Sequence, residues 1–188
     1  MLSNIKPKTG RFMLAEPFMN CPEFDRTVVL LCEHDEEKGT FGLVVNRKME
    51  ESLSSLVPDL DGFDVPLYYG GPVGENSLYY LHDYPELIEG SVKISEGIYM
   101  GGDFEQLKSH INTRKIDPRF IRFYVGYSGW EAGQLTEEMG TNSWIVVPSE
   151  SKYVFSSGSK NLWREVLRDT NDDHFRIISH FPEYPSLN

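Results

Sequence analysis

The 188-residue chain has few cysteines, a shortage of basic residues and no long apolar run. Small secreted domains held by disulfides contain more cysteines than the two present here, Cys21 and Cys32. The longest apolar run, from Val28 to Cys32, is far shorter than a membrane span of about 20 residues. The first residues carry charge without the apolar stretch of a secretory signal. We therefore expect a cytoplasmic protein with reduced thiols and no association with a membrane.

Acidic residues dominate the charge. Lys and Arg number 18 against 29 Asp and Glu, so the formal net charge is −11 at pH 7. Such a field repels phosphate backbones, which makes nucleic-acid binding unlikely on charge grounds. The segment from Lys108 to Arg122 is locally basic, with five cations, one carboxylate (Asp117) and a net charge of +4. The cations are Lys108, Arg114, Lys115, Arg119 and Arg122. Charge balance within the molecule is the simpler interpretation, and nucleic-acid binding there stays open as a weaker hypothesis.

The strongest element is a strand from Thr27 to His34. Val28, Leu30 and Cys32 point to one side and Val29 and Leu31 to the other, so we expect a central strand that is covered on both faces. A polar loop ending in Gly39 and a returning strand, Thr40 to Asn46, complete a hairpin.

The remaining pattern indicates an α+β fold with strands in hairpin order, interrupted by three or four short helices. The other expected strands are Arg11–Ala15, Val65–Tyr69, Ser77–Tyr84, Ser91–Ile94, Ile98–Met100, Arg119–Tyr127, Trp144–Val147 and Tyr153–Phe155. Helical segments are expected at Glu51–Val57, after Asp103 as an N-cap with Gln106 three residues on, at Gly133–Met139 and at Asn161–Arg168. Residues 1–188 form a single domain in this prediction, with a tail at 1–9 and an irregular C-terminal tail at 170–188.

Two glycine-rich segments follow strands. Gly70-Gly71-Pro72 forms a tight turn or brings backbone close to a ligand, and no phosphate-loop pattern accompanies it. The segment from Gly126 to Trp130 nearly matches the turn that carries a serine nucleophile, but Trp130 occupies the position that requires glycine. We interpret Ser128–Trp130 as a turn in which Trp130 is a packing anchor.

Histidine and carboxylate side chains offer no complete catalytic set. His34 and His82 each end an apolar strand segment, where a histidine is either a structural hydrogen-bonding residue or a general base. Cys32 and His34 share a strand face, but a metal site needs three or four ligands, and we expect neither a metal nor a cofactor. The acidic run from Glu33 to Glu37 is interpreted as solvated surface.

Several motifs recur together in one known family. The sequence resembles the AlgH/YqgE family of small bacterial proteins through Gly10–Ala15, Glu33-His34, Gly42–Asn46, Gly70–Val73, Leu81-His82, Gly126–Trp130, Gly133–Leu135, Trp144 and Leu162-Trp163. The resemblance implies an α+β fold with a mixed, largely antiparallel sheet that curls toward a barrel-like core. It also implies a link with the regulation of exopolysaccharide synthesis, and hence a transcriptional regulator. It supplies no catalytic residues.

Three hypotheses follow. The favoured one is a non-enzymatic regulatory or binding protein that acts through a protein partner or a small ligand. The second is an enzyme on a small polar or phosphorylated substrate with His34 and His82 in one pocket, and the third is nucleic-acid binding through Lys108–Arg122. The oligomeric state is left open. The candidate ligand-binding residues are His34, Asn46, Gly70, Gly71, Pro72, His82, Gly129, Trp130 and Gln134.

Overall fold

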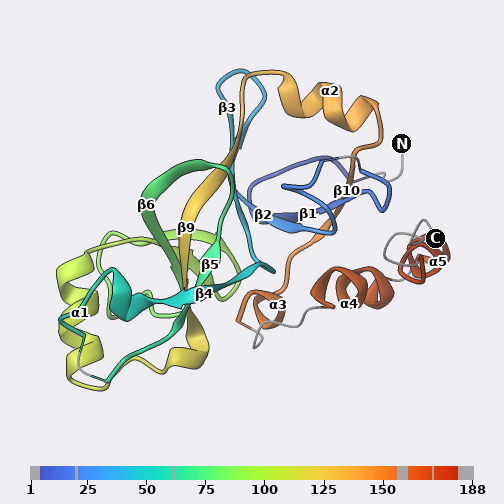
Figure 1. The fold of residues 1–188 in the computed structure, drawn as a ribbon. Helices are drawn as coiled ribbons and strands as arrows, with labels where there is room; N and C mark the ends of the chain where they lie inside the picture. The colour runs from blue at the N-terminus through green and yellow to red at the C-terminus, as the bar shows by residue number, and fades with distance from the viewer. Residues whose placement is uncertain (1–4, 20, 61, 156–160, 171, 182–188) are drawn as a thin grey trace.

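The computed structural model describes residues 5–19, 21–60, 62–155, 161–170 and 172–181. Within these residues the chain forms ten strands and five α-helices (Figure 1). The strands are β1 (Arg11–Ala15), β2 (Val28–Asp35), β3 (Gly39–Val44), β4 (Lys48–Ser52), β5 (Pro66–Tyr69), β6 (Val73–His82), β7 (Val92–Ser95), β8 (Ile98–Met100), β9 (Ile121–Trp130) and β10 (Trp144–Pro148). The helices are α1 (Phe104–Asn112), α2 (Gln134–Gly140), α3 (Ser151–Phe155), α4 (Leu162–Asp169) and α5 (Asp173–Ile178).

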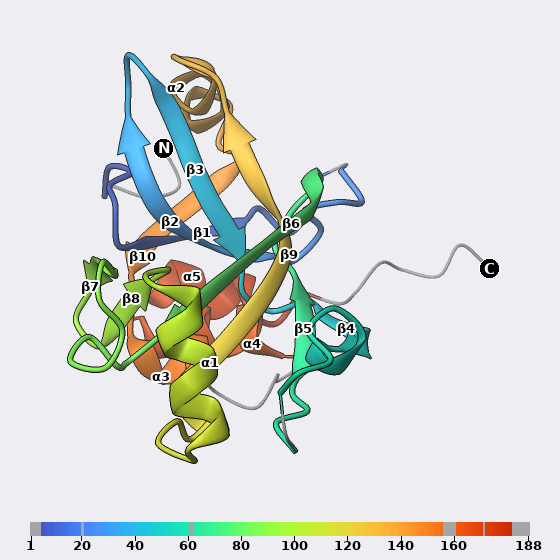
Figure 2. The ribbon, with the colours of Figure 1, turned by 90° about the vertical axis from the view of Figure 1, so that its left-hand side faces the viewer.

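One large sheet organises the molecule, in the order β10-β1-β2-β3-β9-β6-β8-β7. β4 pairs with β5, and β5 runs parallel to β9, whereas the other pairings between described strands are antiparallel. Figure 2 shows the sheet curling between its β1–β2–β3 half and its β6–β8–β7 half. The expected α+β class and the largely antiparallel, curled sheet are confirmed. The described residues contain five α-helices rather than the three or four that the sequence predicts.

β2 is the central, doubly covered strand that its sequence predicts. Val28, Leu30 and Cys32 pack into a core shared with α3, α4 and α5. Val29 and Leu31 pack on the opposite face, in a core shared with α2. All five side chains are at most 4% exposed. Because the apolar residues on both faces are buried, a shift of β2 by one residue would exchange the contents of two cores.

A third core lies between α1 and the other half of the sheet. The side chain of Asp103 accepts a hydrogen bond from the backbone of Gln106, as the sequence predicts for the N-cap of α1. Leu107 and Ile111 are then directed onto β9, where they pack in one cluster with Phe123. None of the helices within the described ranges combines the length and apolarity needed to cross a membrane.

Two predicted segments, Tyr153–Phe155 and Ser128–Trp130, are wrong, and the helical turn predicted within Glu51–Val57 is confirmed in part. Tyr153–Phe155 belongs to α3 rather than to a strand, since its short apolar run is buried beside α4 and pairs with no strand. Glu51–Val57 begins as the end of β4, and its helical part is one 3-10 turn, Leu53–Ser55. Ser128–Trp130 is not a turn, because it continues β9 and pairs with Thr40–Gly42 of β3.

The C-terminal segment is more regular than its polar and proline-containing sequence suggests. Residues 173–178 form α5, whose N-cap Asp172 accepts hydrogen bonds from the backbone of His174 and Phe175. Phe175 and Ile178 join the core beneath α4. Residues 182–188, the last part of the expected irregular tail, lie outside the described residues.

The backbone passes unusually close to β9 between β5 and β6. A Cβ atom on Gly70 would lie 2.2 Å from the carbonyl oxygen of Gly126, and one on Gly71 would lie 2.3 Å from the carbonyl carbon of Tyr127. Gly70 also donates its N–H to Val125 and accepts a hydrogen bond from the N–H of Val44. These glycines are therefore required for backbone-to-backbone contact, and the close approach that their sequence predicts is made to the chain itself.

We predict that Gly70→Ala lowers the free energy of unfolding by about 2 kcal/mol or more, because the atom that blocks its Cβ belongs to rigid backbone. Urea denaturation measures the change. Gly140→Ala is the matched control, since a Cβ at that position in α2 meets nothing within 4 Å. Equal stability of the Gly70→Ala variant and the wild-type protein would contradict the close contact.

Candidate functional site

An open cleft lies where the β2–β3 hairpin and the start of β6 meet the end of β9 and the loop into α2. Figure 2 shows β3, α2 and the end of β9 together at one end of the molecule. The cleft has a volume of about 620 Å³, which falls within the range of small-ligand sites, roughly 300–1,000 Å³. The lining residues from the strands include Glu33, Thr40, Phe41, Val73, Tyr127 and Gly129.

The register of the sheet places three of these residues in one row. Glu33 lies opposite Phe41, and Phe41 lies opposite Gly129. Directly paired residues project from the same face, and so does Tyr127, which is two residues before Gly129 on β9. A bulge in β2 sets this register, because Cys32 is an extra residue between the pairs formed by Leu31 and Glu33.

Aromatic rings form one side of the cleft. Phe41 stacks on Tyr127 with ring centroids 4.9 Å apart. Tyr79 of β6 contacts both rings, at 5.2 Å from Phe41 and 5.9 Å from Tyr127. Tyr127 lies over the surface of Gly129, where a Cβ would come within 3.1 Å of its ring. Glycine at position 129 therefore lets the half-buried Tyr127 ring lie close to the backbone of β9.

The opposite wall is held by Glu138 of α2. One carboxylate oxygen of Glu138 accepts hydrogen bonds from the indole N–H groups of Trp130 (3.0 Å) and Trp144 (2.6 Å). Its other oxygen accepts from the side chain of Gln134 (3.0 Å). The oxygen of the Gln134 amide in turn accepts the backbone N–H of Glu131. Trp130, Glu131 and Gln134 line the cleft, so this network fixes the wall before any ligand arrives.

Three of the nine sequence-predicted site residues, Gly129, Trp130 and Gln134, lie together in this cleft. His34 does not line the cleft, but its Nδ1 is hydrogen-bonded at 2.7 Å to the hydroxyl of Thr40, which does. The other five lie elsewhere.

His82 is at the opposite end of β9 from the cleft. It pairs with Ile121, whereas Thr40, the partner of His34, pairs with Trp130. Nine residues of strand span about 30 Å, so His34 and His82 do not form the single pocket that the enzyme hypothesis requires. His82 is fully buried, and its ring bonds the Gly101 carbonyl through Nε2 and the Tyr84 N–H through Nδ1.

The remaining candidates have structural contacts. Asn46 joins two backbone segments, since its Oδ1 accepts from Val28 and its Nδ2 donates to the carbonyl of Arg26. Gly70 and Gly71 make the close passage across β9 described above, and the exposed Pro72 directly follows them.

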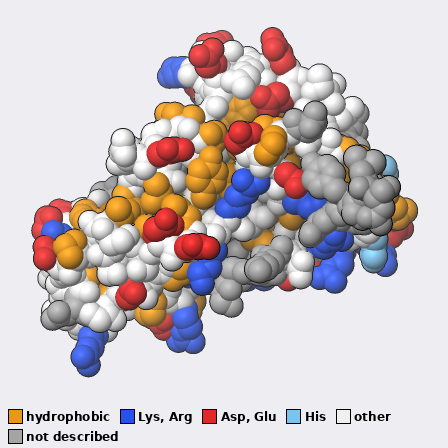
Figure 3. Space-filling model, viewed as in Figure 1, with side chains coloured by type: hydrophobic (Ala, Val, Ile, Leu, Met, Phe, Trp, Pro, Cys, Tyr) orange, Lys and Arg blue, Asp and Glu red, His pale blue; other side chains and the backbone are white. Residues whose placement is uncertain are grey.

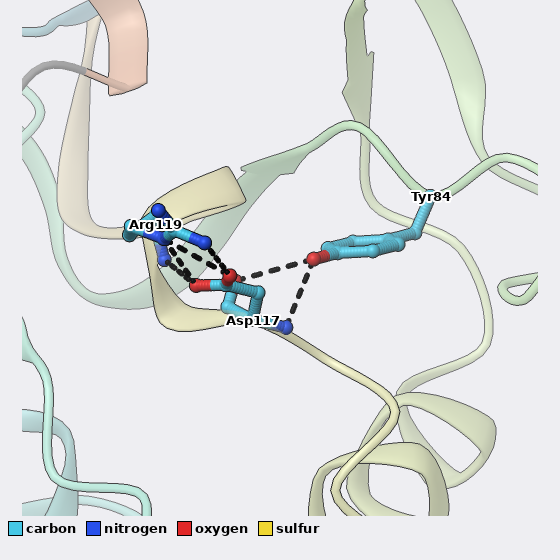
Figure 4. A network of polar contacts seen from close by, with 3 residues as sticks. All are labelled: Tyr84, Asp117 and Arg119. Atoms are coloured by element: carbon cyan, nitrogen blue, oxygen red, sulfur yellow. Dashed lines mark hydrogen bonds and ion pairs between the residues drawn. The ribbon is translucent and has the colours of Figure 1, made fainter.

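The basic segment Lys108–Arg122 is largely neutralised by its neighbours. Lys108 pairs with Glu105 at 2.7 Å, and Arg119 binds both carboxylate oxygens of Asp117. Figure 4 shows Asp117 bound on its other side to the hydroxyl of Tyr84, which accepts the Asp117 N–H at 2.9 Å. Arg122 is buried and donates to the carbonyl of Phe155.

These contacts leave Arg114 and Lys115 as the exposed cations of the segment that have no ion pair among the described residues. Two cations are a small basis for binding a phosphate backbone, where affinity grows with the number of phosphates that are neutralised.

The two cysteines are free thiols. Burial raises the pKa of the Cys32 thiol far above its usual value, which keeps it protonated and unreactive. Within the described part of the chain, no three His, Cys, Asp or Glu side chains are grouped so that they could hold a metal ion.

Sequence reasoning missed Glu33, Phe41, Tyr127, Glu131 and Glu138. Glu33 was grouped with the solvated acidic run, although it alone of that run lines the cleft. The alternation along each strand indicates which residues share a face, but the register that brings Glu33, Phe41 and Gly129 into one row joins three separate strands.

This arrangement defines an α+β protein whose curled sheet carries an open cleft at one end. A family model described as AlgH-like matches residues 12–174. The chain therefore belongs to the AlgH-like family, which confirms the resemblance seen in its motifs.

Similar proteins support the assignment. A "UPF0301 protein" of Bacteroides thetaiotaomicron is 36% identical over 188 residues, which cover 99% of this chain and 94% of the relative. One of Chlorobium limicola is 36% identical over 97% of both chains. The solution structure of the AlgH protein from Pseudomonas aeruginosa aligns with a TM-score of 0.69 at 25% identity, over 96% of this chain and all of that one. A crystal structure of a Corynebacterium diphtheriae protein aligns with a TM-score of 0.77 at 24% identity, over 94% of each chain, and shows the same fold.

We predict that Glu138→Ala destabilises the protein by about 2–4 kcal/mol, because two indole N–H groups lose their acceptor at once. The tryptophan emission spectrum changes with it. Glu137→Ala is the matched control, since Glu137 is exposed on the same helix. Denaturation curves that coincide for the two variants would show that the network contributes nothing.

A second prediction concerns pH. Burial lowers the pKa of His82 below its ordinary value near 6.5, since the charged imidazole is poorly solvated inside the protein. Below about pH 6.5 the unfolded chain binds a proton that the folded protein resists, so acidification destabilises the fold. We expect stability to fall between pH 7.5 and 5.5 in urea titrations, and His82→Gln to reduce that fall. An identical pH dependence in the variant would exclude His82 as a cause.

Proposed function

We propose that the protein is a non-enzymatic regulatory binding protein that holds a protein partner or a small ligand in the cleft between the β2–β3 hairpin and α2. The observation that carries this proposal is the convergence on one open cleft of half-buried aromatic rings, a fixed polar wall and two carboxylates, Glu33 and Glu131, that have no ion-pair partner among the described residues. Such a surface is organised before a ligand arrives, which reduces the entropy lost on binding.

The character of the cleft favours binding over catalysis. His34, the histidine nearest to it, is turned to Thr40, and neither histidine nor cysteine is among the described residues that line it. The competing enzyme hypothesis needed His34 and His82 in one pocket, and their separation along β9 removes that basis. A role in regulation accords with the family resemblance. We place the protein in the cytoplasm, in keeping with its free thiols.

Gly129→Val tests the proposal directly. Gly129 is exposed and does not have a positive φ, so the backbone accepts valine, and its side chain occupies the cleft once the adjacent Tyr127 ring shifts to admit the new Cβ. We expect the variant to fold, with a modestly lower melting temperature because the Tyr127 ring is displaced, and to lose its ligands. The readouts are a thermal-shift screen against a metabolite panel and a pull-down from bacterial lysate, each carried out with both proteins.

Gly140→Ala is the matched glycine control, because it lies outside the cleft on α2. Ligands or partners that bind the wild-type protein and this control, but not Gly129→Val, support the proposal. Two results would refute it: identical binding by all three proteins, or no thermal shift and no retained partner for the wild-type protein.

A further inference from the structure

The cleft combines two features that suit a positively charged side chain. Aromatic rings attract cations through the negative potential of their faces, and carboxylates form charge-assisted hydrogen bonds with ammonium and guanidinium groups. Phe41 and Tyr127 supply the rings, and Glu33 and Glu131 supply the carboxylates. The sheet register places Glu33 directly opposite Phe41, so the charge and the aromatic surface are adjacent.

Both carboxylates are available to a ligand. Glu33 and Glu131 are exposed, and neither side chain has an ion-pair or hydrogen-bond partner among the described residues. In the described structure Glu131 bonds to Gln134 through its backbone alone: its N–H donates to the Gln134 side chain, and its carbonyl accepts the Gln134 N–H. The acidic pair therefore remains uncompensated within the described structure.

One cation, Lys38, also lines the cleft, but it lies near a different carboxylate. Its Nζ is 3.9 Å from Asp35, and its side chain is 84% exposed. With two glutamates and one lysine, the lining carries a formal charge of −1, on a chain whose net charge is −11. On the face shown in Figure 3, acidic side chains likewise lie among exposed hydrophobic ones. This field attracts cations and repels anions.

We propose that the cleft receives an arginine or lysine side chain from an extended basic segment of a partner protein. The proposal rests on the proposed binding function and names the chemistry of the ligand. The aliphatic part of the side chain packs against Phe41 and Tyr127, and its charged end reaches Glu33 or Glu131.

The exposure of the walls favours a peptide over a free amine. Small-molecule sites bury most of their ligand, whereas Glu33, Val73, Gly129 and Glu131 are exposed in this cleft. An occupant of this open cleft stays partly in solvent, as suits a side chain that remains attached to a larger molecule. The backbone of that molecule is then free to contact Val73, which is 40% exposed at the rim.

The test uses two synthetic pentapeptides with blocked ends, Gly-Arg-Gly-Arg-Gly and the same peptide with citrulline in place of arginine. Citrulline keeps the shape of arginine and removes its charge. Titrations are followed by amide chemical shifts of the isotope-labelled full chain. We expect the arginine peptide to shift the amide resonances of Glu33, Phe41 and Gly129. The expected dissociation constant is on the order of 0.1–1 mM.

Two charge variants sharpen the test. The double substitution Glu33→Gln and Glu131→Gln weakens the binding of the arginine peptide about tenfold, because it removes charge-assisted hydrogen bonds and keeps the side-chain shape. Glu36→Gln is the matched control, since Glu36 is exposed on the same hairpin and does not line the cleft. Added salt weakens wild-type binding, as expected for partly exposed charges.

Several outcomes would overturn the inference: equal binding of both peptides, full affinity of the double variant, no shifts at about 5 mM peptide, or free butylammonium binding as tightly as the peptide.

The failure of this inference is distinguishable from the failure of the proposed function. If Gly129→Val loses its partners while the double variant keeps them, the cleft binds a ligand of different chemistry. If both variants keep them, the proposed function fails as well.

Discussion

The close passage of Gly70 and Gly71 across β9 is the contact on which the arrangement of the sheet depends. β9 pairs with β5 through Phe123–Val125 and with β3 through Ser128–Trp130. The transition falls at Gly126, which has a φ of +70° and whose carbonyl oxygen lies against Gly70. At this crossing no side chain separates the backbone of Gly70 and Gly71 from that of β9. The single strand β9 therefore joins the core beneath α1 to the cores on either side of β2.

The cleft arises from the same crossing. β6 begins at Val73, which pairs with Tyr127, and it then runs antiparallel to β9 toward Ile121, away from Gly129. β3 meanwhile continues along the other edge of β9 to Thr40 and Trp130. No residue of β6 therefore pairs with Gly129, which is exposed beside the stacked rings, and α2 closes the opposite wall through Glu138.

The parts of the fold that follow from local sequence were predictable. The twin apolar faces of β2 and the N-cap of α1 at Asp103 each depend on a few consecutive residues, and both are confirmed. The helix α5 was missed because much of its stabilisation comes from Phe175 and Ile178 packing beneath α4, a tertiary contact that no local pattern encodes.

The candidate site was predictable only in part, for a related reason. Glycine after a strand indicates close approach, but the sequence does not say what approaches. At Gly70 it is the backbone of β9, whereas at Gly129 it is the Tyr127 ring at the edge of the cleft. The pairing of Glu33 with Phe41 also depends on the bulge at Cys32, which local alternation does not reveal.

That bulge divides β2 into two parts under different constraints. Up to Cys32, each side chain is enclosed by a core and a substitution there affects folding directly. From Glu33 onward, the side chains are partly or largely in solvent while their positions are still set by the ladder to β3. The exposed positions of β2 beyond the bulge are therefore able to acquire new side chains with less effect on the interior, so that ligand preference is able to change in descendants of one ancestral scaffold while the fold persists.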